Sequence, residues 1–209
     1  MRHLFIIIIV SFFQTFNFTI MAQVQGEYIF SKQEMVAGFY FSADGKFNFF
    51  YSYGAVDRTA EGTFTIEGDT VKLKSDKEAG KDFTIIKQQK IGKGYTIQFE
   101  DDNKYLLTNI RCSFFTGTEM HDEYTDTSGT IKVDMEHCDK IYVQHLLFPD
   151  IVTLIKDETN GNNTFTLTLN PSLSQVSFKD IDLIIKDGKT LKCIPNYFMM
   201  VEDIEFEKQ

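Results

Sequence analysis

The stretch that decides the fold reads GFYFSADGKFNFFYSYG and covers residues 38–54. Two runs rich in aromatic residues flank the pair Asp44-Gly45, and a glycine closes each end of the stretch. Aromatic residues favour β-strands, and an Asp-Gly pair between two such runs favours a tight turn. The stretch therefore predicts a β-hairpin.

The register of this hairpin follows from the positions of its aromatic residues. Those that should share one face lie at odd positions: Phe39, Phe41, Phe47, Phe49 and Tyr51. A two-residue loop would pair odd positions with even ones and divide this set between the two faces. A three-residue loop pairs Phe41 with Phe47 and Phe39 with Phe49, with Gly45 left-handed in a bulge. We expect the three-residue loop.

The same aromatic set is the candidate for lining a ligand cup. The candidate ligand-lining residues are Phe39, Phe41, Phe47, Phe49 and Tyr51. A β-barrel of about eight strands either fills its interior with side chains or holds one small apolar ligand. We favour a filled core, because a small module needs its buried aromatic side chains for stability. A cup for a small hydrophobic ligand is the alternative.

A second hairpin follows the first. The pair Gly68-Asp69 fits a two-residue type II′ loop that sets Ile66 opposite Val71 and Phe64 opposite Leu73. Residues 83–86 and 95–99 are further candidate strands, and no stretch shows a convincing helical period. The sequence predicts an all-β protein.

The turns along residues 26–73 resemble those of lipocalin-like barrel modules in secreted proteins of Bacteroidota. The matching features are an opening Gly-x-Tyr, an Asp-Gly-x-Phe turn, a Gly-Thr-Phe strand and a Gly-Asp-x-Val-x-Leu hairpin. They are carried by Gly26, Tyr28, Asp44, Gly45, Phe47, Gly62, Thr63, Phe64, Gly68, Asp69, Val71 and Leu73. The resemblance implies an antiparallel barrel and carries little information about function.

Residues 95–170 resemble the carboxypeptidase regulatory-like, transthyretin-like β-sandwich. The matching features are, in chain order, an acidic turn, a strand over 106–114, a Thr-Asp-x-x-Gly turn from Thr125, an Ile-x-Val strand at 141–143 and a closing strand at 165–169. The Gly-Tyr that usually follows the Ile-x-Val strand is replaced by His145-Leu146-Leu147-Phe148-Pro149. The resemblance implies a sandwich fold and no catalysis, because the enzyme in the family name is a neighbouring domain.

These resemblances predict four segments. Residues 1–22 form a signal peptide, 23–92 the first part of the lipocalin-like module, 93–170 the sandwich, and 171–209 the closing strands of the first module. In this arrangement the sandwich is inserted into the barrel. The alternative is two consecutive domains with a C-terminal extension.

The N-terminus predicts export. Arg2 precedes an apolar run that is too interrupted for a membrane-spanning helix of about 20 apolar residues, and cleavage is expected after Ala22. No cysteine lies near that site, so no lipid anchor is indicated. We expect a secreted or periplasmic protein with no membrane span after cleavage.

Composition limits the partners. The formal net charge is −9, which disfavours nucleic acid and anionic membrane surfaces as partners. The cysteines are Cys112, Cys138 and Cys193, so at most one internal disulfide is possible, for example Cys112 with Cys138; buried free thiols are the alternative.

No recognised catalytic motif is present, and we expect neither an enzyme nor a cofactor. The favoured function is a non-enzymatic binding module for a small hydrophobic ligand or an envelope protein. The alternative is a metal-handling protein or enzyme with a site around His121, His137 and His145, although their spacing matches no known ligand pattern.

Overall fold

The computed structural model describes residues 24–199 and 202–209, so the predicted signal peptide and its cleavage site after Ala22 lie outside the described residues. The described chain is all-β, as predicted, with two short 3₁₀ helices. It forms two compact units. The first contains residues 24–77 together with Val176–Gln209, and the second is Glu78–Gln175. None of the helices in the described ranges is long and apolar enough to cross a bilayer.

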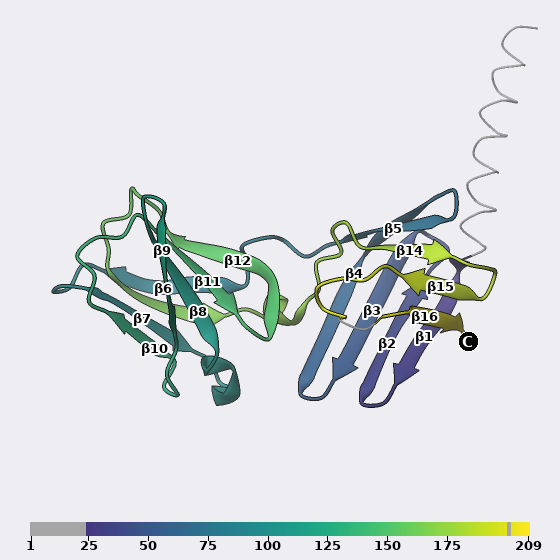
Figure 1. Ribbon diagram of the computed structural model, residues 1–209, viewed down its shortest axis with the longest axis horizontal. Helices are drawn as coiled ribbons and strands as arrows, with labels where there is room; N and C mark the ends of the chain where they lie inside the picture. Colours follow the sequence, from purple (N-terminus) through teal and green to yellow (C-terminus); the bar gives the residue numbers. More distant parts are fainter. Residues whose placement is uncertain (1–23, 200–201) are drawn as a thin grey trace, which may run out of the picture. The chain divides into compact units, whose positions relative to one another are not determined.

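The first unit is a closed barrel of eight antiparallel strands (Figure 1). Its strands are β1 (Gly26–Lys32), β2 (Met35–Phe41), β3 (Lys46–Tyr53), β4 (Val56–Glu67), β5 (Thr70–Ser75), β14 (Asp182–Ile185), β15 (Thr190–Cys193) and β16 (Ile204–Lys208). Around the barrel the strands follow their order in the chain. The meander is therefore interrupted only between β5 and β14, where the second unit is inserted.

Both predicted hairpins of the barrel are confirmed, including their registers. Phe41 is opposite Phe47 and Phe39 is opposite Phe49. The Gly45 N–H donates to the Ser42 carbonyl at 3.3 Å, and Gly45 has a φ of +82°, as a three-residue loop with a left-handed glycine requires. In the second hairpin Ile66 is opposite Val71 and Gly68 has a φ of +64°.

The closing strands complete the barrel. Strand β14 pairs with β5 on one side, and β16 pairs with β1 on the other, with Tyr28 opposite Lys208. The Phe206 ring lies 5.0 Å from the Phe39 ring, centroid to centroid. The barrel core thus joins side chains from both ends of the chain.

The predicted boundaries of the inserted unit were wrong. Strand β6 (Phe83–Gln89) falls in the segment 23–92 that was assigned to the barrel, but it pairs with β13 (Thr164–Leu169) in the second unit. The pairing sets Phe83 opposite Leu169. The barrel has no place for β6, because the other edge of β5 is taken by β14.

The second unit contains two four-stranded sheets. Sheet B has the order β10-β7-β13-β6, and sheet C has the order β12-β11-β8-β9. The remaining strands are β7 (Tyr95–Glu100), β8 (Ile110–Thr116), β9 (Glu119–Tyr124), β10 (Thr130–Val133), β11 (Lys140–His145) and β12 (Phe148–Lys156). Strands β13 and β7 run parallel, whereas the other pairs are antiparallel.

One face of each sheet in this unit is buried. Sheet B contributes Ile97 and Phe165, and sheet C contributes Cys112 and Val143, all with no exposed surface. The alternation along β11 is regular, because Ile141, Val143 and His145 are buried while the residues between them are partly exposed. The other face of sheet C is therefore turned away from this core.

The strand predicted over residues 106–114 begins later than expected. Lys104–Leu107 form a 3₁₀ helix, and β8 begins at Ile110. Between them Asn109 has a φ of +63°, a left-handed conformation that asparagine adopts more readily than most residues. The left-handed residue separates the helical turn from the strand.

Candidate functional site

The structure brings the five candidate ligand-lining residues together inside the barrel. Phe39, Phe41, Phe47, Phe49 and Tyr51 are all buried. Their rings pack on one another: Phe39 lies 4.7 Å from Phe49 and 5.5 Å from Phe41, centroid to centroid. These separations lie in the range of stabilising aromatic pairs. The set therefore belongs to the packed core of the barrel.

Two further aromatic residues enter this core from outside the strands. Phe178 lies 4.9 Å from Phe49 and 5.6 Å from Phe47, and Phe198 lies 5.7 Å from Phe49. Two hydrogen bonds hold the segment that carries Phe178: the Val176 N–H donates to the Thr59 carbonyl at 2.8 Å, and the Phe178 N–H donates to the Ser75 hydroxyl at 2.8 Å. Side chains of this chain thus occupy the space that a ligand cup would need beside the candidate residues.

The barrel interior also holds Arg58, which sequence reasoning missed. Arg58 is 2% exposed, lies opposite Tyr51, and places its guanidinium 6.0 Å from the centre of the Phe198 ring. A guanidinium over an aromatic ring gains a favourable cation–π interaction. The alternation of side chains along β4 could have indicated this inward position, because Arg58 falls in the same alternate positions as the buried Ala60 and Phe64.

The structure does not assemble the alternative site around the three histidines. His121 Nε2 lies 2.8 Å from Glu123 Oε1, and His137 Nε2 lies 2.7 Å from Asp139 Oδ1. His145 is fully buried at the end of β11. Within residues 24–199 and 202–209, no group of three or more His, Cys, Asp or Glu side chains is arranged to hold a metal ion. The alternative hypothesis of a histidine-centred metal site therefore has no geometric support.

The hydrogen bonds of His145 fix its protonation state. Its Nδ1 accepts from the Leu147 N–H at 3.1 Å, and its Nε2 donates to the Leu106 carbonyl at 3.2 Å. This pattern requires the neutral imidazole with its proton on Nε2. Burial lowers the pKa of His145 below its ordinary value of 6.5, and the bond to Leu106 opposes the shift only in part. His145 is a structural residue.

The three cysteines are free and buried. The suggested pairing of Cys112 with Cys138 is therefore not formed, and the alternative of buried thiols is correct. Burial raises the pKa of Cys112, and it raises the pKa of Cys193 to about 12. The Cys193 thiol donates to the Ile194 carbonyl. A thiol whose pKa is raised by burial is a poor nucleophile at neutral pH.

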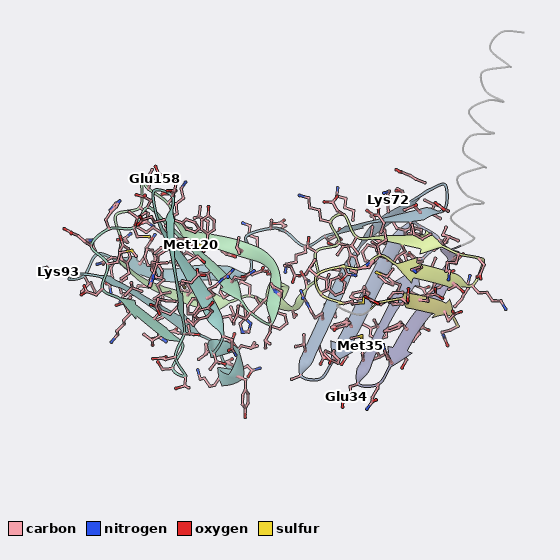
Figure 2. All side chains as sticks on the ribbon, in the orientation of Figure 1. Glu34, Met35, Lys72, Lys93, Met120 and Glu158 are labelled. Carbon is pink, nitrogen blue, oxygen red and sulfur yellow. The ribbon has the colours of Figure 1, made fainter. Side chains whose placement is uncertain are left out.

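The outer face of sheet C carries a depression with a volume of about 510 Å³. Its apolar lining residues are Phe115, Met120, Tyr142 and Val152, which come from four different strands. Met120 is 57% exposed and Val152 is 45% exposed. Figure 2 labels Met120 on β9 and Glu158 beyond the end of β12, and both line the depression. We call this the outer-face depression.

The aromatic residues of the outer-face depression form an edge-to-face pair. The ring centroids of Phe115 and Tyr142 are 5.6 Å apart and the ring planes meet at 81°. Both side chains are only partly buried. In such a pair one ring keeps both of its faces clear of the other ring. Because both rings also line the depression and are partly exposed, aromatic surface is accessible to a ligand at its floor.

The charged lining residues of the depression are two bases and two acids, namely Arg111, Lys140, Asp139 and Glu158. Lys140 Nζ lies 3.3 Å from Glu158 Oε1. Asp139 accepts a hydrogen bond from the Gly117 N–H at 2.7 Å, and this bond, together with His137, lowers the pKa of Asp139. The charges are balanced, so the depression has no strong preference for a cation or an anion.

A polar network borders the depression on β8. Arg111 donates to the Gln144 side chain and lies 3.8 Å from an Asp122 carboxylate oxygen. Asp122 also accepts from the Ser113 hydroxyl at 2.5 Å. Arg111 Nε is buried and has no hydrogen-bond partner among the described residues. The sequence did not predict this site, because the strands expected from it do not include β9 and β12, which supply two of its walls.

No protein-family model, curated protein or solved structure matches this chain.

Proposed function

We propose that this chain is a non-enzymatic binding protein, secreted or periplasmic, and that it binds its target on the outer face of sheet C. In this proposal the barrel is a lipocalin-like scaffold and the second unit a carboxypeptidase regulatory-like sandwich, as in exported proteins of Bacteroidota. The turn motifs of the barrel and the order of strand motifs in residues 95–170 support these family assignments. The apolar N-terminal run behind Arg2 supports export.

The observation that carries the proposal is the exposure of large apolar side chains around the outer-face depression. Met120, Val152 and Leu154 are each about half exposed, and Leu154 lies opposite Tyr142 on the neighbouring strand. Exposed apolar side chains gathered beside polar ones on an ordered sheet are typical of interaction sites. Isolated exposed apolar residues would need no such explanation.

The packing of the barrel supports different roles for the two units, with the barrel as scaffold and the second unit as the binding domain. Phe178 and Phe198 lie against the aromatic set that would otherwise line a cup. A packed barrel serves as a stable scaffold, and it leaves binding to the sandwich. A barrel that binds a small hydrophobic ligand would have to move these rings first.

Native mass spectrometry of the protein isolated from the cells that produce it tests this proposal. We expect a bound species on the native chain that is lost in Val152→Asp, because a carboxylate at the rim disfavours an apolar contact. Ile86→Asp is the matched control, since Ile86 is 53% exposed on sheet B and does not line the depression. A species that remains bound to Val152→Asp would contradict the proposed surface. If that species were a lipid, the barrel would be the binding site instead.

A further inference from the structure

The shape and chemistry of the outer-face depression narrow the class of ligand that it fits. Its volume of about 510 Å³ lies within the range of sites for small ligands, roughly 300–1,000 Å³. Its floor lies on β8 and β11, the two central strands of sheet C. A ligand at this floor meets side chains rather than a free sheet edge.

The position on central strands disfavours an extended peptide. Strand β8 pairs with β11 and β9, and β11 pairs with β8 and β12, so the backbone groups at the floor are already committed to the sheet. A peptide laid on this face would find no backbone partners for its own amide groups. Leaving such groups unpaired on burial is costly.

The balanced charges disfavour an ionic ligand. Arg111 and Lys140 supply donors, while Asp139 and Glu158 supply acceptors, within one depression. An anion or a cation would be attracted by one pair and repelled by the other. A hydroxyl group both donates and accepts hydrogen bonds, so it can pair with either kind of side chain. A ligand with several hydroxyl groups can therefore form hydrogen bonds with both the basic and the acidic residues of the lining.

The aromatic pair suits the C–H groups of a ligand that carries several hydroxyl groups. The faces of aromatic rings are electron-rich. They attract C–H groups made slightly positive by neighbouring oxygen atoms, and a sugar ring presents several of these on one side. Phe115 and Tyr142 meet edge to face with centroids 5.6 Å apart, and both partly exposed rings line the depression. Val152 and Met120 add apolar contacts at the rim.

We propose that the outer-face depression binds an uncharged carbohydrate, with a sugar ring against the Phe115 and Tyr142 pair and its hydroxyl groups on the surrounding charged side chains. This inference rests on the proposed function, because it names the ligand class for the same surface. Tyr142 supplies the ring contact. Lys140 and Glu158 lie where they can bind hydroxyl groups while remaining paired with each other.

The test is binding of the full chain to an array that carries uncharged oligosaccharides, sulfated and sialylated oligosaccharides, and peptides. We expect binding to uncharged oligosaccharides. Tyr142→Ala should weaken this binding by about tenfold or more, since about 1.4 kcal/mol corresponds to a factor of ten. Tyr142→Phe, which keeps the ring, should bind nearly as the native chain does. Tyr40→Ala is the matched control, because Tyr40 is an exposed tyrosine on the barrel.

Each other outcome overturns the inference in a distinguishable way. Binding only to charged oligosaccharides would contradict an uncharged ligand. Binding only to peptides, with loss in Tyr142→Ala, would overturn the carbohydrate assignment and leave the proposed binding surface standing. Carbohydrate binding that Tyr142→Ala does not weaken, although the variant unfolds at the native temperature, would place the site elsewhere. An absence of binding to every glycan would overturn the inference, while the mass-spectrometry experiment would still decide the proposed function.

Discussion

Lys72 and Asp182 lie 110 residues apart in the chain, yet the Lys72 Nζ lies 2.5 Å from the Asp182 Oδ2. They face each other across β5 and β14, the strands that flank the inserted unit. Beside them Leu183 lies opposite Val71, and neither of these side chains has exposed surface. The barrel is thus closed across the insertion by an ion pair at its surface and by apolar contacts in its core.

The apolar contacts should contribute most of the stability of this junction. Leu183→Ala is expected to lower the free energy of unfolding by about 2–5 kcal/mol, as removal of a buried leucine generally does. Asp182→Asn should lower it by less than about 1 kcal/mol, because Lys72 is partly exposed and solvent screens the pair. Urea unfolding of the two variants measures both effects. Equal losses would show that the ion pair matters more than its exposure indicates.

The first hairpin depends on a left-handed residue at Gly45. Gly45→Val should lower the free energy of unfolding by roughly 1–3 kcal/mol, since a β-branched residue is strained at a φ of +82°. Asn48→Val is the control, because Asn48 is exposed on β3, where valine fits a strand. Thermal unfolding compares the two, and an unchanged melting temperature in Gly45→Val would contradict the strain.

Local signals in the sequence predicted the features that depend on neighbouring residues. The loop length at Gly45 and the pairing of Phe39 with Phe49 followed from turn chemistry and from the alternation of side chains along a strand. The resemblance assigned residues 171–209 to the barrel, but the sequence did not predict the contact of Phe206 with Phe39, because the two residues lie far apart in the chain. Local patterns do not specify which distant strand is the neighbour.

The candidate site was harder to predict for two physical reasons. Strand β9 is an exposed edge strand with the sequence EMHDEY, so it shows no buried alternation from which a strand could be inferred. Strand β12 contains Pro149, and a proline argues against a strand in the middle of a sheet because it has no N–H to donate. The structure places β12 at the edge of sheet C, where proline is tolerated. Without these strands, Met120 and Val152 could not be assigned to the same depression as Tyr142.

Strands β4 and β5 approach each other closely at Gly62, which lies opposite Ser75. A Cβ added there would lie 2.1 Å from the Lys74 carbonyl oxygen and 2.7 Å from the Ser75 Cα, both backbone atoms. Gly62→Ala should therefore lower the free energy of unfolding by about 1–3 kcal/mol or more. Gly188→Ala is the matched control, because nothing lies within 4 Å of a Cβ there. Urea unfolding that gives equal stabilities would contradict the close approach.

The stability of the second unit should depend on pH through His145. Burial lowers the pKa of the folded-state imidazole below 6.5, whereas in the unfolded chain the pKa is close to 6.5. Below that pH the unfolded state binds a proton that the folded state does not, so the free energy of unfolding decreases as the pH falls. Protonation at Nδ1 would also remove the hydrogen bond from the Leu147 N–H.

Two measurements check this prediction. Urea unfolding from about pH 7.5 to about pH 5.5 should show decreasing stability, and His145→Gln should show a weaker dependence on pH, because the variant has no imidazole at this position. In NMR spectra, the imidazole signals that disappear in His145→Gln identify this residue, and in the native chain they should titrate with a pKa below 6.5. A pKa at or above 6.5 would contradict the prediction. It would show that the buried ring accepts a proton readily despite its hydrogen bonds to Leu106 and Leu147.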